Sequence, residues 1–163
     1  MLSLTRKSDY ALVALAYLGQ RRVACEPAVS ARKIADQFNL PLPLLMNILK
    51  DLAHAKLVSS TRGQSGGYTL AHDPENVTIL EVITALEGPS RLTPCADDLT
   101  VLGQECQVCG CGIRGPIRRL NQRIQSFLEN MTLLDLMETD PDAEHLSSGV
   151  KVNLLTRYAA ASL

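Results

Sequence analysis

Four of the five cysteines of this chain lie close together in the sequence. They are Cys95, Cys106, Cys109 and Cys111, whereas Cys25 stands alone. Thiolates bind soft and borderline metals, and residues 90–112 lack the helical periodicity that would hold these thiols apart. Because nothing in the sequence indicates secretion and disulfide formation, the group predicts a metal or cluster site. For Cys25 we expect only a packing role.

The spacing of the four cysteines bears on which metal they would hold. Structural zinc sites typically use two Cys-x2–4-Cys pairs. Only Cys106 and Cys109 form such a pair here, and Cys95 has no close partner. Iron–sulfur clusters accept less regular spacings. Spacing alone therefore favours an iron–sulfur cluster, with a zinc site as the alternative and four free thiols as the remaining interpretation.

Composition limits the chain to a small globular protein. With 163 residues, 46% hydrophobic and 20% charged, it can bury one core and is neither disordered nor fibrous. The absence of Trp and an aromatic content of 4% argue against a protein that stacks single-stranded bases. No apolar run approaches the roughly 18 residues of a membrane span, and no cleavage site follows the N-terminal apolar stretch. We expect a cytoplasmic protein without membrane contact.

Charge is distributed unevenly, although the net charge is only −1. Residues 1–75 carry nine Lys and Arg against six Asp and Glu, and residues 76–163 carry seven against eleven. A protein that is basic along its whole length is excluded. The N-terminal half can nevertheless present a basic face to an acidic partner such as DNA.

The N-terminal half is predicted to begin with three helices. Helical spacing of apolar residues predicts the first over residues 8–20, with Ser8 as its N-cap. The second is expected over residues 31–38, capped by Ser30. Proline fits the first position of a helix, so the third is expected to begin at Pro43.

A β-hairpin is predicted after these helices, with strands over residues 57–61 and 68–71 on either side of a Gly-rich turn. Three helices and a hairpin in this order are typical of a winged helix–turn–helix. In that fold the third helix enters the major groove, and the hairpin tip reaches the minor groove or the phosphates. We expect the glycines at 63, 66 and 67 to let the tip approach DNA closely. The alternative is a protein-interaction domain of similar shape.

Candidate DNA contacts lie on the third helix and the hairpin. The outer face of the third helix is expected to carry Asn47, Lys50 and Asp51, and Arg62 is the best placed charge at the hairpin tip. The apolar start of the third helix argues for few base contacts. The predicted set of DNA-binding residues is Lys7, Tyr10, Asn47, Lys50, Ser60, Arg62 and Gln64.

Two further helices are predicted, one on each side of the cysteines. The first runs from Thr78 to Glu87, and the second follows Pro116. One face of the second carries arginines, and the other carries an apolar stripe of Ile117, Leu120, Ile124, Phe127, Leu128 and Met131. No structure is predicted for residues 138–163, and the three histidines are expected at the surface.

Several segments together resemble the iron–sulfur winged-helix repressors that include IscR, NsrR and RirA. They are TRKSDYA (5–11), LVSSTRGQSGGY (57–68), TILEVITALEG (78–88) and FLENMTLLDL (127–136). The resemblance covers about residues 1–137, and Pro41-Leu42-Pro43 is most similar to regulators of the SUF cluster-assembly system. It implies a homodimer that binds double-stranded DNA, is joined through the long C-terminal helix and holds a cluster near the dimer axis.

The resemblance also implies a ligand set. Family members supply three cysteines and a variable fourth ligand. Cys95, Cys106 and Cys111 take the three cysteine positions. Cys109 departs from the family pattern and is an alternative ligand, a resolving thiol or the fourth ligand itself.

Two other residues bear on the fourth ligand. Arg114 stands where IscR has a ligand histidine, and an arginine cannot serve there. Asp9 matches the position from which NsrR supplies a carboxylate across the dimer. Asp9 and Cys109 are therefore the two candidates, and a 4Fe–4S cluster is favoured over a 2Fe–2S cluster. The simpler interpretation of Asp9 is that its charge favours a helix N-terminus.

The resulting prediction is a mainly helical transcription regulator, not an enzyme, whose operator affinity depends on an iron–sulfur cluster. The signal would be cluster supply, iron, redox state or nitric oxide. The alternatives are a winged-helix regulator with a structural zinc site and an electron-transfer iron–sulfur protein. The expected divisions are a DNA-binding domain (1–89), a cluster-binding loop (90–113), a dimerisation helix with a following turn (114–137) and a tail (138–163).

Overall fold

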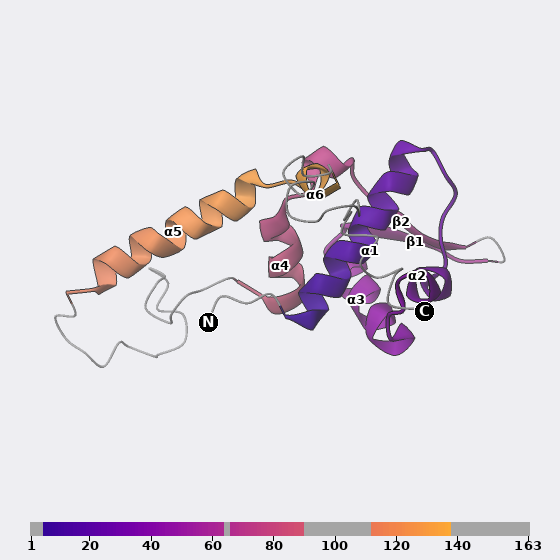
Figure 1. The fold of residues 1–163 in the computed structure, drawn as a ribbon, viewed down its shortest axis with the longest axis horizontal. Coiled ribbons are helices and arrows are strands. Elements are labelled where there is room, and N and C mark those ends of the chain that lie inside the picture. The colour runs from indigo at the N-terminus through magenta and orange to yellow at the C-terminus, as the bar shows by residue number, and fades with distance from the viewer. Residues whose placement is uncertain (1–4, 64–65, 90–111, 138–163) are drawn as a thin grey trace, which may run out of the picture.

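The computed structural model describes residues 5–63, 66–89 and 112–137. These residues form a mainly helical fold with one two-stranded hairpin, which confirms the predicted fold class (Figure 1). The elements in chain order are α1 (Arg6–Val23), α2 (Ala31–Phe38), α3 (Leu42–His54), β1 (Val58–Thr61), β2 (Gly67–Leu70), the 3-10 helix η1 (Pro74–Asn76), α4 (Ile79–Glu87), α5 (Arg114–Asn130) and α6 (Leu133–Met137).

Helix α1 forms the centre of the core. Its residues 11–18 are all buried, and it contacts α3, α4, α6 and β2. A helix surrounded in this way is apolar on nearly all sides. The predicted N-cap is wrong by three positions, because the helix begins at Arg6 and the Thr5 hydroxyl accepts the amide of Ser8 at 3.3 Å. Ser8 itself is fully buried and has a distant partner, described below.

Helices α2 and α3 follow the sequence prediction closely. The Ser30 hydroxyl accepts the Lys33 amide at 3.2 Å, so the predicted cap and bounds of α2 are confirmed. Asn39, with a φ of 50°, ends α2 in the left-handed conformation and turns the chain towards α3. Helix α3 begins at Leu42, so Pro43 occupies its second position instead of the predicted first. Proline is tolerated there because amides in the first turn have no partner within the helix.

The hairpin pairs β1 and β2 antiparallel, with Ser60 opposite Tyr68. Strand β1 is one residue shorter than predicted, and β2 has the predicted length but begins and ends one position earlier. Val29 extends the pairing, since its amide and carbonyl bond to the Tyr68 carbonyl and amide at 3.0 and 2.8 Å. A Cβ on Gly67 would lie 2.5 Å from the Val29 backbone. The absence of a side chain at Gly67 is therefore required by contact within the protein, whereas the sequence suggested an approach to DNA.

Helix α4 is fixed at its start by a capping box. The Thr78 hydroxyl accepts the Glu81 amide at 3.2 Å, and the Glu81 carboxylate accepts the Thr78 amide at 2.9 Å. Thr78 is thus the N-cap and not, as predicted, the first helical residue. Because its side chain bonds forward to the first turn, its own backbone stays extended.

Helices α5 and α6 differ in how they relate to the core. Helix α5 contacts α4 but extends away from the other helices (Figure 1). Helix α6 returns to pack on α1, and its Leu133 is fully buried. The Leu133 amide bonds to the Val77 carbonyl at 2.8 Å, and the Ile79 amide bonds to the Met131 carbonyl at 2.9 Å. The residues after α5 therefore complete the core that the N-terminal half begins.

Candidate DNA interface and metal centre

Helix α3 presents a polar outer face because its inner face is locked into the core. Its buried residues are Leu45, Ile48, Leu49 and Leu52. Asn47 and Lys50 are exposed on the opposite face, together with Met46, whose side chain is 51% exposed. An amide and an ammonium on a rigid helix can contact base edges and phosphates in the major groove.

The hairpin carries the second group of predicted DNA contacts. Ser60 on β1 and Arg62, which directly follows β1, are both exposed. Gly63 has a φ of 118°, a backbone conformation that residues with a side chain rarely adopt. Nothing lies within 4 Å of a Cβ built at Gly63, so the turn is open on that side. Gln64 lies outside the described residues.

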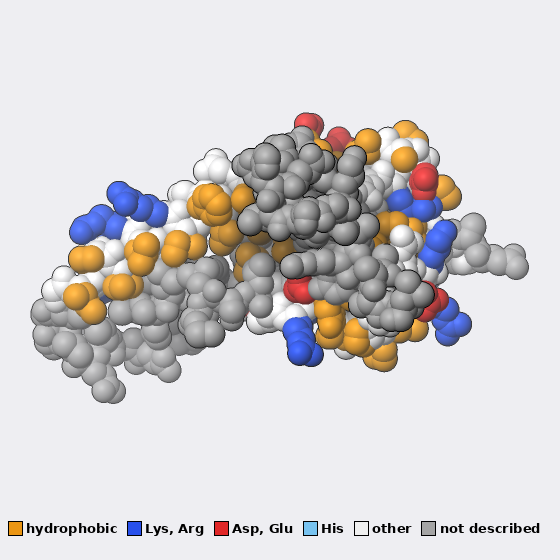
Figure 2. Space-filling view, in the orientation of Figure 1, with side chains coloured by type: hydrophobic (Ala, Val, Ile, Leu, Met, Phe, Trp, Pro, Cys, Tyr) orange, Lys and Arg blue, Asp and Glu red, His pale blue; other side chains and the backbone are white. Residues whose placement is uncertain are grey.

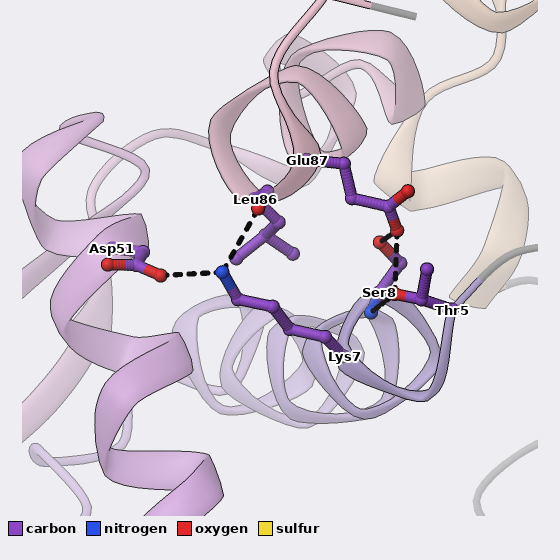
Figure 3. A network of polar contacts seen from close by, with 6 residues as sticks. All are labelled: Thr5, Lys7, Ser8, Asp51, Leu86 and Glu87. Atoms are coloured by element: carbon purple, nitrogen blue, oxygen red, sulfur yellow. Dashed lines mark hydrogen bonds and ion pairs between the residues drawn. The ribbon is translucent and has the colours of Figure 1, made fainter.

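Lys7 and Tyr10, also predicted to contact DNA, have partners inside the protein. The Lys7 ammonium lies 2.8 Å from the Asp51 carboxylate and donates to the Leu86 carbonyl at 3.0 Å (Figure 3). Tyr10 is half-buried and packs against the core. Asp51 was expected to face solvent on α3 and is instead half-buried beside Lys7. The structure thus brings Lys7 to both α3 and α4.

The predicted metal ligands are only partly visible. Cys95, Cys106, Cys109 and Cys111 lie outside the described residues, and the part of the chain that is described contains no group of three His, Cys, Asp or Glu able to hold a metal. Asp9 is half-buried in the first turn of α1. As a donor set, clustered thiolates with one carboxylate suit iron–sulfur ligation better than magnesium or calcium, which prefer oxygen ligands.

Cys25 lies away from this region, between α1 and α2. It has a φ of 53°, is exposed and lines a cavity of about 260 Å³ with Arg21, Arg22 and Tyr68. Arg21 is already engaged, since it pairs with Glu26 at 2.5 Å. The expected partial burial of Cys25 is therefore wrong, and its surroundings give no sign of a metal role.

The end of α4 is held against the first turn of α1. The Glu87 carboxylate accepts hydrogen bonds from the Ser8 hydroxyl and, at 2.7 Å, from the Thr5 hydroxyl (Figure 3). These bonds, that of Ser8 foremost, lower the pKa of Glu87 because they stabilise its charged form. The described chain continues only two residues beyond Glu87, to Pro89. Asp9 and the last described residues before the cysteines therefore belong to the same corner of the fold.

A family model described as "Rrf2: Iron-dependent Transcriptional regulator" matches residues 4–139. The chain belongs to the Rrf2 family. An rrf2-like helix–turn–helix transcriptional regulator of Rhodobacter capsulatus is 32% identical to this Rrf2 protein over 148 residues, which cover 88% of this chain and 97% of the relative.

Two solved structures have a similar fold. IscR of T. potens has a TM-score of 0.62 at 27% identity and covers 91% of this chain and 93% of its own. CymR, the global cysteine regulator of B. subtilis, has a TM-score of 0.64 at 29% identity, with 84% of this chain and 97% of CymR covered.

The family assignment confirms the predicted resemblance and decides the broad class of function. This Rrf2 chain is a transcriptional regulator with a DNA-binding winged helix, and it is not an enzyme. No helix in the described ranges is long and apolar enough to cross a membrane.

Sequence reasoning missed two residues that the structure brings to this corner, Asp51 and Glu87. Their partners are Lys7, 44 positions away from Asp51, and Ser8, 79 positions away from Glu87. Periodicity and capping rules relate residues three or four positions apart, so neither contact has a signal in a single sequence.

Proposed function

We propose that this Rrf2 chain is a transcription regulator whose operator affinity is controlled by a bound iron–sulfur cluster. The observation that carries the proposal is the family match over residues 4–139, which spans both the winged helix and all four clustered cysteines. Cys95, Cys106 and Cys111 are the proposed ligands, with Asp9 or Cys109 as the fourth. When bound, a 4Fe–4S cluster, which we favour over 2Fe–2S, would supply redox and ligand-exchange chemistry that links these residues to a signal.

The proposal includes a homodimer joined through α5. Three large apolar side chains, one at the N-cap of this helix and two within it, are exposed at intervals of seven positions: Ile113 (66%), Leu120 (48%) and Phe127 (62%). Ile117, Ile124 and Met131 alternate with them and are half-buried. Figure 2 displays this hydrophobic strip over α5 beside a group of Lys and Arg side chains. Alternating steps of four and three are the pattern of a helix-to-helix seam, so a second copy of α5 is the occupant we propose.

DNA binding in this proposal depends on the distance between two copies of α3. In each protomer Asn47 and Lys50 would contact the major groove, while Arg62 would reach the minor groove or a phosphate. Half-sites on one face of DNA are separated by about 34–36 Å or multiples of it, so small rotations about the dimer interface change affinity. In the sequence, the cysteines come after α4, which contacts α1 and α3, and before α5. A change in their ligation can therefore alter that separation.

A regulator with a structural zinc site is the second candidate, favoured only by the Cys106-x-x-Cys109 pair. An electron-transfer protein would not require the winged helix. We also propose a cytoplasmic location, because thiolate ligands must stay reduced.

Anaerobic purification tests the cofactor directly. The expected product is a brown protein with visible absorption and with iron and acid-labile sulfide in equal amounts. A colourless protein that retains zinc after purification would instead support the zinc site. A protein without either metal, after reconstitution with iron and sulfide, would contradict the proposed control.

A further inference from the structure

One ammonium group connects three helices of the DNA-binding unit. The Lys7 side chain starts in the first turn of α1, pairs with Asp51 on α3 at 2.8 Å and donates to the Leu86 carbonyl near the end of α4 at 3.0 Å (Figure 3). The side chains of Lys7 and Asp51 are 33% and 39% exposed. Two of the three donors of the ammonium are thus engaged within the protein.

Asp51 occupies a sensitive place on α3. It directly follows Lys50, lies one turn beyond Asn47 and precedes Leu52, which is fully buried. Its carboxylate therefore stands at the border between the outward face of α3 and the core. A carboxylate at that border would repel the phosphates of bound DNA, and Lys7 neutralises it.

The other end of the connection is equally well held. The carbonyl of Leu86 belongs to the last turn of α4, where carbonyls have no partner within the helix and attract a positive charge. Lys7 satisfies this carbonyl, and the next residue, Glu87, is bound by Thr5 and Ser8. Side-chain contacts from Thr5, Lys7 and Ser8, at the start of α1, therefore hold the end of α4, the helix that leads into the cysteine region.

We infer that Lys7 is a positioning residue for operator binding, which sets the orientation of α3 relative to the end of α4, and that it does not contact a phosphate. This inference rests on the proposed role of α3 in reading the operator. Helices α3 and α4 also contact each other directly, and Lys7 adds a polar connection between them. Lys7 therefore lies on one route by which the state of the cysteine region would alter DNA affinity.

Two substitutions distinguish positioning from direct contact, because the two roles predict opposite signs for one of them. Lys7→Met removes the connection, and Asp51→Asn weakens it while leaving Lys7 in place. Lys33→Met, on the exposed side of α2, controls for the loss of one positive charge, and Lys50→Met tests whether α3 contacts DNA at all. Binding is titrated at several salt concentrations on a duplex that the wild-type protein selects from a random-sequence pool, and thermal unfolding confirms that each variant is folded.

If Lys7 positions α3, Lys7→Met and Asp51→Asn both raise Kd, by about three- to tenfold, although the second removes a negative charge. In that case the slope of log K against log salt for each variant differs from that of the wild type by less than about 0.9, the change expected for the loss of one phosphate contact. Tighter binding by Asp51→Asn, together with a slope reduced by about 0.9 in Lys7→Met, would mean that Lys7 contacts DNA and would overturn the inference. Unchanged Kd in both variants would overturn it as well.

The same titration separates this inference from the proposed function. An unchanged Kd for Lys50→Met would remove α3 from the interface, and the inference with it. Normal sensitivity to Lys50→Met with no response to Lys7→Met or Asp51→Asn would leave α3 as the reading helix and overturn only the role of Lys7. Because the proposed function makes DNA affinity depend on the cluster, all variants are prepared anaerobically and compared at equal metal content.

Discussion

Ser8 and Glu87 are 79 positions apart in the chain, yet the Ser8 hydroxyl donates a hydrogen bond to the Glu87 carboxylate. Ser8 is fully buried, so this contact satisfies a hydroxyl that would otherwise lack a partner in the core. Together with the bond from Thr5, it fixes the end of α4 to the start of α1. The corner that carries Asp9 is therefore built by side chains from both ends of the DNA-binding unit.

The lowered pKa of Glu87 predicts a dependence of stability on pH. A carboxyl whose pKa is lower in the folded state stabilises the fold above its unfolded pKa, here 4.5, and this stabilisation is lost as pH falls through the lower folded value. Glu87→Gln should therefore lose less stability than the wild type on acidification below about pH 5. Urea unfolding at a series of pH values measures this, with the exposed Glu75→Gln as a matched control. Parallel curves for wild type and Glu87→Gln would show that the bonds from Ser8 and Thr5 do not discriminate between charged and neutral Glu87.

Arg62→Ala should weaken DNA binding without changing the metal content or the oligomeric state. The exposed guanidinium follows β1 directly, and the loss of one groove or phosphate contact costs about 1–3 kcal/mol. A mobility-shift titration at fixed salt on the selected duplex gives the change. Arg119→Ala on α5 is the control, because it removes the same charge from a helix that we assign to the dimer. Equal affinity for Arg62→Ala and wild type would remove the hairpin tip from the interface.

Substitution of the exposed apolar side chains of α5 should dissociate the proposed dimer. Leu120→Glu and Phe127→Glu each place a charge in the expected seam and should raise the dimer dissociation constant by about 30-fold or more. Sedimentation velocity over a range of protein concentrations measures this. Gln122→Glu, which is also exposed on α5 but lies outside the apolar stripe, should have no effect. A wild-type protein that sediments as a monomer would contradict the seam.

The cysteines should differ in their contribution to the cluster. Alanine at Cys95, Cys106 or Cys111 should abolish cluster absorption, because each removes a thiolate ligand, whereas Cys109→Ala should only alter it. Anaerobic reconstitution of each variant, followed by absorption and iron analysis, provides the comparison, and Cys25→Ala serves as the control. Complete loss of colour in Cys109→Ala alone would make Cys109 a principal ligand and require a different set of three.

Asp9→Ala, with Cys109 retained, tests the proposed carboxylate ligand. If Asp9 binds iron, the variant cluster should show a changed spectrum and faster loss of iron in air. If Asp9 only favours the start of α1, the effect is limited to stability, at about 0.3–1 kcal/mol. Thermal unfolding of the metal-free protein measures that second contribution separately. An unaltered cluster in Asp9→Ala would leave Cys109 as the remaining candidate.

The local elements of this fold could be predicted from the sequence by itself. The bounds of α2, its Ser30 cap and its inward face follow from residues three and four positions apart, and the structure agrees with each. The buried stripe of α3 was predicted for the same reason, and the hairpin was predicted from a Gly-rich turn between two short strand-like segments. Errors are confined to ends, such as Ser8 and Pro43, where several residue types can satisfy a first turn.

Tertiary structure alone decided what the polar side chains of the first turn of α1 do. Ser8 was predicted to cap a helix, but folding brings Glu87 to it from a distant position. Folding also brings Asp51 and Leu86 to Lys7, for which the sequence suggested only a DNA contact. The same holds for Gly67, whose lack of a side chain is explained by the Val29 backbone. Helix geometry repeats over a few residues and is visible in one sequence, whereas these contacts exist only because packing of the apolar core places remote segments within hydrogen-bonding distance.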